Sequence, residues 1–140
     1  MSKKSAKIAA LIDRHRGHQL SPYYLGYFEL FNTQLFYESH DVLEELWLPI
    51  RKEAGGDFYK GLIQLAGAFV HLQKNRLRPS AALFKLARTN LEKYPKQHEH
   101  LDIALVLDVI AEWLARLEKN NFSENPLLTF KTPNLSLIRI

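Results

Sequence analysis

The chain has 140 residues, the length of one domain, and its composition of 46% apolar and 24% charged residues excludes a disordered chain. It contains no cysteine, which excludes disulfides, thiolate metal sites and a cysteine nucleophile. The formal net charge of +4 permits an anionic partner without requiring one.

The beginning of the chain carries no targeting pattern. Its first apolar run ends at Ile12, because Asp13 and Arg14 follow at once, and this run is too short for a secretory signal. No stretch approaches the ~20 apolar residues that span a membrane. We therefore expect a cytoplasmic protein with no membrane partner, which the absence of cysteine also fits.

Apolar residues at helical spacing predict six helical segments. The pair Ser21-Pro22 is typical of a helix start, with serine as N-cap and proline at the first helical position. Pro49 and Pro95 mark the ends of two others. The predicted helices cover residues 5–16, 21–31, 35–48, 57–75, 79–94 and 99–119.

The segment 57–75 is apolar on most of its circumference, which predicts a central position in the fold. Gly61 and Gly67 lower its helix propensity, and we expect them to let another helix come close. In the two following helices, Leu86 and Leu105 are among the residues expected to face inward.

The fold class that follows is all-α. We predict a compact antiparallel bundle of five to six helices over residues 1–121, followed by an irregular tail over 122–140. Pro126 and Pro133 prevent a long helix in the tail. Its apolar end, 135–140, could dock against the bundle or a partner, or be loose.

Polar side chains on two neighbouring helices form the candidate site. In the segment 35–48, Glu44 follows His40 by one helical turn, so the two side chains can meet, and Trp47 lies beside His40. In the segment 57–75, Gln64 and His71 lie two turns apart on one stripe of an otherwise apolar helix. If the two helices pack as an antiparallel hairpin, these groups could face one another in a polar cleft.

Three interpretations of this constellation stay open. In the structural one, His40 bonds to Glu44 and the stripe with Gln64 and His71 is simply exposed. In the second, our leading hypothesis, the domain is a binding or interaction module whose cleft orients a small ligand or a protein partner. In the third, His40, Glu44 and His71 form a metal-assisted or acid/base site of a hydrolase-like enzyme, with zinc or iron as the divalent metal.

The chain lacks the known sequence patterns for such chemistry. It has no His-Glu-x-x-His zinc motif, no glutamates spaced as in di-iron bundles, and no glycine-rich phosphate loop. The sequence therefore requires no cofactor. It does not determine the oligomeric state, and it leaves a homo-oligomer open.

Basic side chains support one further hypothesis, nucleic-acid binding through helix faces. They gather in the first helix and in the helix 79–94, as in many nucleic-acid binders and in many ordinary solvated helices. The residues are Lys3, Lys4, Lys7, Arg14 and Arg16 in the first group and Arg78, Lys85 and Arg88 in the second. His15 and His18, next to Gly17, are expected in solvent.

Two ordered motifs resemble the domain of unknown function 309 family. The first comprises Phe31-Asn32, Phe36-Tyr37-Glu38 and the run His40–Trp47; the second is the run Gly61–Gln73, with Ala81-Ala82-Leu83 after it. The resemblance covers about residues 23–91 and implies a small all-α fold without an assigned activity. Its matching polar positions are Glu38, His40, Glu44, Gln64 and His71. At Gln34 the chain departs from the family, whose members often carry glycine there.

Overall fold

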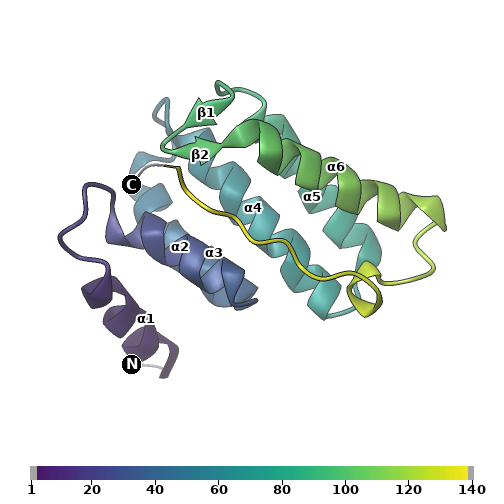
Figure 1. Cartoon of the computed structure of the whole chain (residues 1–140), viewed down its shortest axis with the longest axis horizontal. Helices are drawn as coiled ribbons and strands as arrows, with labels where there is room; N and C mark the ends of the chain where they lie inside the picture. Colours follow the sequence, from purple (N-terminus) through teal and green to yellow (C-terminus); the bar gives the residue numbers. More distant parts are fainter. Residues whose placement is uncertain (1–2, 139–140) are drawn as a thin grey trace.

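Six α-helices and a returning tail make up the fold of the computed structural model, which describes the backbone of residues 3–138 and the side chains of residues 6–138 (Figure 1). The α-helices are α1 (Lys3–Arg14), α2 (Pro22–Asn32), α3 (Phe36–Trp47), α4 (Gly56–Gln73), α5 (Leu77–Leu91) and α6 (Ile103–Lys119). Two 3-10 helices, η1 (Leu48–Ile50) and η2 (Pro126–Leu128), and two short strands, β1 (Gln97–His98) and β2 (Leu101–Asp102), complete the described elements. The predicted all-α class with an irregular C-terminal region is confirmed.

The predicted helix start at Ser21-Pro22 is confirmed, and α6 has a side-chain cap of the same kind that was not predicted. The Ser21 hydroxyl accepts a hydrogen bond from the Tyr23 amide at 3.2 Å, with Pro22 in the first turn of α2. Asp102 caps α6 in the same way, through the Leu105 amide at 3.0 Å. Each cap satisfies an amide that the helix itself leaves without a partner.

The turn between α2 and α3 shows why a glycine would suit the position at which this chain carries Gln34. This residue has a φ of 66°, in the left-handed region where glycine carries no steric penalty. Gln34 thus adopts a backbone conformation that a glycine would adopt without a steric penalty. Its carbonyl receives a hydrogen bond from the Gln73 amide group at 3.1 Å.

Helix α4 lies at the centre of the bundle, as predicted. The ring of its residue Phe69 meets aromatic rings from four other helices, at centroid distances of 4.9–5.6 Å. These rings belong to Phe31 of α2, Phe36 of α3, Phe84 of α5 and Trp113 of α6. A single side chain therefore connects α2, α3, α5 and α6 to α4 in one core.

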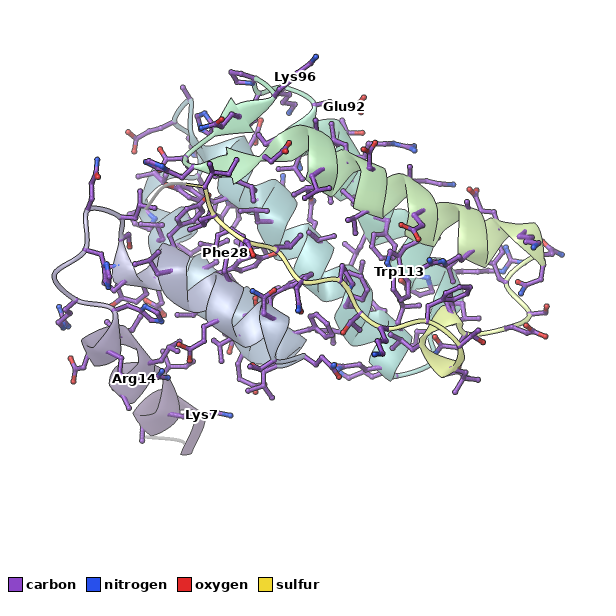
Figure 2. The ribbon with its side chains drawn as sticks, in the orientation of Figure 1. Lys7, Arg14, Phe28, Glu92, Lys96 and Trp113 are labelled. Atoms are coloured by element: carbon purple, nitrogen blue, oxygen red, sulfur yellow. The ribbon has the colours of Figure 1, made fainter. Side chains whose placement is uncertain are left out.

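Charged side chains lie on the periphery of this core. In Figure 2, Lys7, Glu92 and Lys96 extend outward, whereas Trp113 lies among the helices. Across residues 3–138, no helix combines the length and the apolar character that crossing a membrane requires.

Gly61 and Gly67 allow the close approach of α5, as expected. A Cβ atom at Gly61 would lie 2.9 Å from Leu91 Cγ, and one at Gly67 would lie 3.0 Å from the Leu83 side chain. The absence of a side chain at these two positions thus allows α4 and α5 to pack closely.

Several local predictions are wrong. Leu86 and Leu105 are 50% and 52% exposed, because Phe84 and Ala87 of α5 and Val106 of α6 occupy the inward positions instead. The predicted helix over 99–119 begins only at Ile103, since β1 and β2 form an antiparallel hairpin before it.

The hairpin turn has a clear physical reason. Glu99 and His100 both adopt positive φ values, 50° and 60°, as the two central residues of tight hairpin turns do. Neither residue is a glycine, so the sequence carried little signal for such a turn.

Helix α5 also begins earlier than predicted, at Leu77, with Pro79 inside its first turn.

The tail crosses the bundle toward the hairpin instead of hanging loose (Figure 1). Asn125 donates from its side chain to the Leu72 carbonyl at the end of α4, at 2.7 Å. Further along, Leu135 is buried, and the Ile138 amide donates to the His100 carbonyl at 2.7 Å. Of the two alternatives for the described part of this segment, docking on the bundle is the one realised.

Candidate functional site

Helix α3 has one buried face that fixes its rotation against α2. Phe36, Val42 and Leu43 are fully buried, and the Ser39 hydroxyl donates to the Tyr27 carbonyl at 3.0 Å. This packing leaves the neighbouring stripe of α3 at the edge of solvent. His40 lies on that stripe.

The expected pairing of His40 with Glu44 is confirmed. His40 Nδ1 lies 2.9 Å from Glu44 Oε1, one helical turn further on. The same nitrogen lies 3.3 Å from Asp41 Oδ1. The side chains of the three residues are 30%, 33% and 29% exposed, respectively, so the cluster is partly buried and reachable from solvent.

Asp41 is the residue that the sequence interpretation missed. Consecutive residues of a helix are ~100° apart, so helical spacing alone places Asp41 on a different face from His40. Its short side chain turns back to the imidazole instead. The signal available in the sequence was the triple His-Asp-x-x-Glu, in which both carboxylates lie within reach of one ring.

A cleft lies on the surface between α3 and α4, and His40 is part of its lining. It has a volume of about 280 Å³, and Leu83 of α5 contributes part of its wall. The lining residues are Tyr37, His40, Ile63, Gln64, Gly67, Val70, His71, Lys74 and Leu83. Three predicted site residues, His40, Gln64 and His71, thus come together on one cavity.

His71 brings a neutral imidazole to this cleft. Burial of the ring, and next the positive charges of Arg76 and Lys74, lower the pKa of His71 below its usual value of 6.5. Its Nδ1 is buried and makes no hydrogen bond within the described part of the chain. One ring nitrogen is a donor and the other an acceptor in this form, so the ring can serve a ligand in either sense.

Gln64 is oriented by a polar network between α4 and α5. Its Oε1 accepts a hydrogen bond from the Asn90 side chain at 2.7 Å. Asn90 in turn accepts from Lys93 at 3.2 Å, and Lys93 pairs with Asp57 at 2.7 Å. The oxygen of Gln64 is thereby engaged, which makes its NH₂ the group that a ligand in the cleft would meet.

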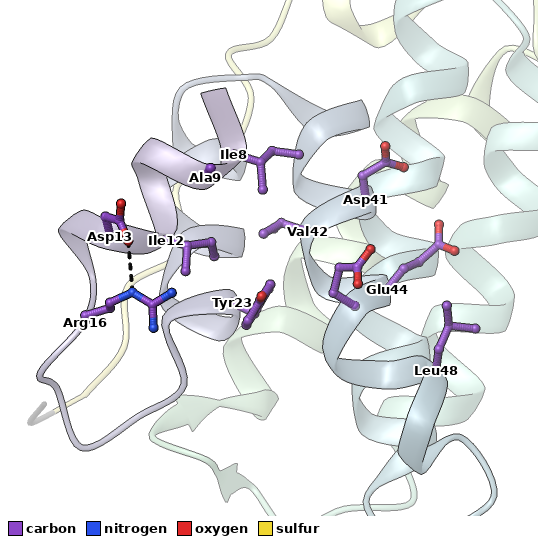
Figure 3. A pocket seen from close by; sticks show the side chains of 11 residues that line it. Ile8, Ala9, Ile12, Asp13, Arg16, Tyr23, Asp41, Val42, Glu44 and Leu48 are labelled. Carbon is purple, nitrogen blue, oxygen red and sulfur yellow. Dashed lines mark hydrogen bonds and ion pairs between the residues drawn. The ribbon is translucent and has the colours of Figure 1, made fainter. Parts of the chain in front are cut away.

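The other predicted site residues lie outside this cleft. Glu38 and Trp47 are half-buried on α3 and are not among the residues that line it, and the buried indole Nε1 of Trp47 makes no hydrogen bond within the described residues. Glu44 lines a different pocket of about 580 Å³ between α1 and α3, together with Asp41 (Figure 3).

The predicted metal set of His40, Glu44 and His71 therefore needs a correction. Among the described residues, the group whose donor atoms all lie within 4.8 Å of one another is His40, Asp41 and Glu44. His71 is not part of it. This donor group consists of residues of α3 alone, because the imidazole of His40 directs its Nδ1 toward carboxylates of the same helix.

The basic helix faces are interleaved with acids. Arg14 pairs with Glu29 at 2.7 Å, and Lys85 lies 3.5 Å from Glu118. Arg16 pairs with Asp13, and Arg78 lies over the ring of Phe122. The side chains of Lys3 and Lys4 lie outside the described residues. This arrangement gives the nucleic-acid hypothesis no added support.

His15 also differs from its expectation. It is half-buried, and its Nε2 lies 2.9 Å from Glu29 Oε1, whereas His18 is exposed as expected. Burial raises the pKa of the Glu29 carboxyl, but hydrogen bonds and charges from Arg14 and His15 outweigh it, so the net shift is downward. These contacts tie α1 to α2.

A comparison with known protein families gives a match over the central helices. No curated protein and no solved structure gives a significant match to the chain. The family match covers α2 without its first two residues, α3, α4 and the first half of α5, and so includes both walls of the cleft. The suspected family is thereby confirmed, and residues 24–83 are the part of the chain that matches the Domain of unknown function (DUF309).

Proposed function

We propose that this domain is a binding module, and that the cleft between α3 and α4 takes a small organic molecule that carries a carboxylate. One observation carries the proposal: His40 of α3 and Gln64 and His71 of α4 line one cavity whose other walls are largely apolar. Apolar walls with a few convergent polar groups are typical of ligand sites.

The dimensions and charges of the cleft support this class of ligand. A volume of about 280 Å³ lies at the small end of known ligand pockets, which are typically ~300–1,000 Å³. Ile63, Val70 and Leu83 offer contact to an apolar body, and Lys74 supplies a positive charge at the edge. The NH₂ of Gln64 adds a donor for an oxygen ligand.

The hydrolase-like alternative has less support from the geometry. It required His40, Glu44 and His71 around one point, whereas Glu44 is not among the residues that line the cleft. Binding without chemistry is the simpler function. The expected cytoplasmic location is part of the same proposal.

Benzoate is a suitable probe, because it combines a small apolar ring with one carboxylate. We expect saturable shifts of backbone amide signals around residues 37–40 and 63–74 when benzoate is titrated into ¹⁵N-labelled protein in the presence of EDTA. Lys74→Gln should weaken this binding about three- to tenfold, since it removes one charge-assisted contact.

Lys60→Gln is the matched control, because Lys60 is an exposed lysine of α4 that does not line the cleft, whereas Lys74 directly follows α4 and lines it. It should leave benzoate binding unchanged. Equal weakening by both variants would show nonspecific charge attraction. Shifts that do not saturate, or that gather away from the cleft, would contradict the proposal.

A further inference from the structure

The geometry points to a divalent metal site on α3, formed by His40, Asp41 and Glu44. This inference does not rest on the carboxylate ligand proposed for the cleft: the two share His40, but Asp41 and Glu44 are not among the residues that line the cleft. The ion we propose is a transition metal such as Zn²⁺ or Mn²⁺. Its three protein ligands are His40 Nδ1 and one oxygen of each carboxylate.

The distances from the His40 nitrogen to the two carboxylates agree with those around a bound ion, and the three donor atoms all lie within 4.8 Å of one another. Ligand atoms at ~2.0–2.2 Å from a metal lie about 2.8–3.6 Å from one another when they occupy adjacent positions of an octahedral or tetrahedral site. Here Nδ1 of His40 lies 2.9 Å from Glu44 Oε1 and 3.3 Å from Asp41 Oδ1. An ion can therefore replace the present contacts through small movements of side chains, without a change in the backbone.

The helix holds the three ligands on a rigid support. Ser39 and Val42, the residues on either side of the His40-Asp41 pair, are fully buried, and Ser39 is bonded to the Tyr27 carbonyl of α2. Rigid elements keep a metal site within the narrow geometry that binding requires. The separations between the three donor positions are thus set by α3 and its packing.

The donor set selects the kind of ion. Two carboxylates offset the charge of a divalent cation, and the imidazole nitrogen favours transition metals over Mg²⁺ and Ca²⁺, which prefer oxygen alone. The three side chains stay about one third exposed. Three protein ligands and access for solvent are the features of an open site, in which water or a ligand completes the coordination.

The position of the cluster links it to both neighbouring cavities. His40 lines the cleft between α3 and α4, and Asp41 and Glu44 line the pocket between α1 and α3 (Figure 3). An ion at the cluster would lie at the ridge between the two. A ligand in either cavity could then reach it.

Zn²⁺ binding to the metal-free full chain tests the inference. Calorimetric titration should give one site per chain. Asp41→Asn and Glu44→Gln should each weaken Zn²⁺ binding about tenfold or more, because each removes one charged ligand. Mn²⁺ should broaden the amide signals of residues 40–45 first.

Glu29→Gln is the matched control. Glu29 also lies 2.9 Å from a histidine, His15, but it is not part of a three-donor group among the described residues. This variant should bind Zn²⁺ like the unaltered chain. Thermal unfolding of each variant without metal checks that α3 still folds. If a variant does not fold, the imidazole signals of His40 in the unaltered chain report Zn²⁺ binding directly.

The site would be overturned by no Zn²⁺ binding, by unchanged binding in both α3 variants, or by a loss in Glu29→Gln equal to theirs. A shift of the His15 signals instead of the His40 signals would place the ion elsewhere and contradict the site as well. The benzoate experiment is run with EDTA, so its failure alone would contradict the cleft proposal and leave the metal site standing.

Discussion

His71 shows, at the scale of one residue, how burial sets a charge. Its Nδ1 is enclosed and makes no hydrogen bond within the described chain, and the ring lies near two positive side chains, Arg76 and Lys74. All of these disfavour the imidazolium form. The ring is therefore kept neutral at a pH where an ordinary histidine begins to gain its proton.

Stability should consequently fall as the pH falls below the usual histidine pKa of 6.5. In that window the unfolded chain binds a proton at His71 more readily than the folded chain does, so the free energy of unfolding decreases until the pH reaches the lowered pKa of the folded state. His71→Gln removes this contribution. Urea unfolding at pH 7.5 and 5.5 should show a smaller difference between the two pH values for the variant.

His18→Gln is the control, since His18 is exposed and lies outside the cleft between α3 and α4. It should keep the pH dependence of the unaltered chain. The same dependence in His71→Gln would mean that other groups cause it.

At the scale of elements, the contact between α4 and α5 depends on a glycine. The Cβ position of Gly61 is 2.9 Å from Leu91 Cγ and 3.3 Å from the Ala87 carbonyl oxygen. The leucine side chain can adjust, but the backbone oxygen can move only with the whole of α5. A bulky side chain here must therefore push the two helices apart.

We expect Gly61→Val to lower the free energy of unfolding by about 1–3 kcal/mol, the usual cost of overpacking. Gly55→Ala provides the comparison, because a Cβ at Gly55 would meet nothing within 4 Å. Its effect should stay within about 0.5 kcal/mol. Chemical unfolding measures both, and equal effects would refute the role given to the close approach.

At the scale of the whole molecule, the tail holds both ends of the bundle together. The side chain of Asn32, the last residue of α2, donates to the Leu135 carbonyl at 2.8 Å and accepts from the Leu135 amide at 2.7 Å. This pair copies the hydrogen bonds of a β-strand, and it lies 103 residues apart in the chain. It positions Leu135 to bury its side chain.

Asn32→Ala should release this segment. The buried backbone groups of Leu135 would lose both partners, at a cost of about 1–3 kcal/mol in unfolding free energy. Hydrogen exchange at residues 135–138 should become faster. Asn134→Ala, which removes an exposed neighbour in the same segment, should leave the exchange unchanged. Unaltered exchange in Asn32→Ala would show that burial of Leu135 alone holds the tail.

The sequence by itself determined the features that arise within one helix. The start of α2 at Ser21-Pro22, the end of α3 before Pro49 and the pairing of His40 with Glu44 all depend on residues within about one turn of each other. The apolar circumference of α4 likewise sufficed to predict its central place, because a helix without a polar face must be covered by others.

Only the tertiary structure decided which faces meet. It turned Leu86 and Leu105 to solvent, bonded Gln64 to Asn90, and laid the tail along Asn32. Spacing along one helix says which side chains share a face, but it does not say what covers that face. What covers a helix face depends on packing among helices and on hydrogen bonds between residues far apart in the chain, and local sequence patterns do not reveal either.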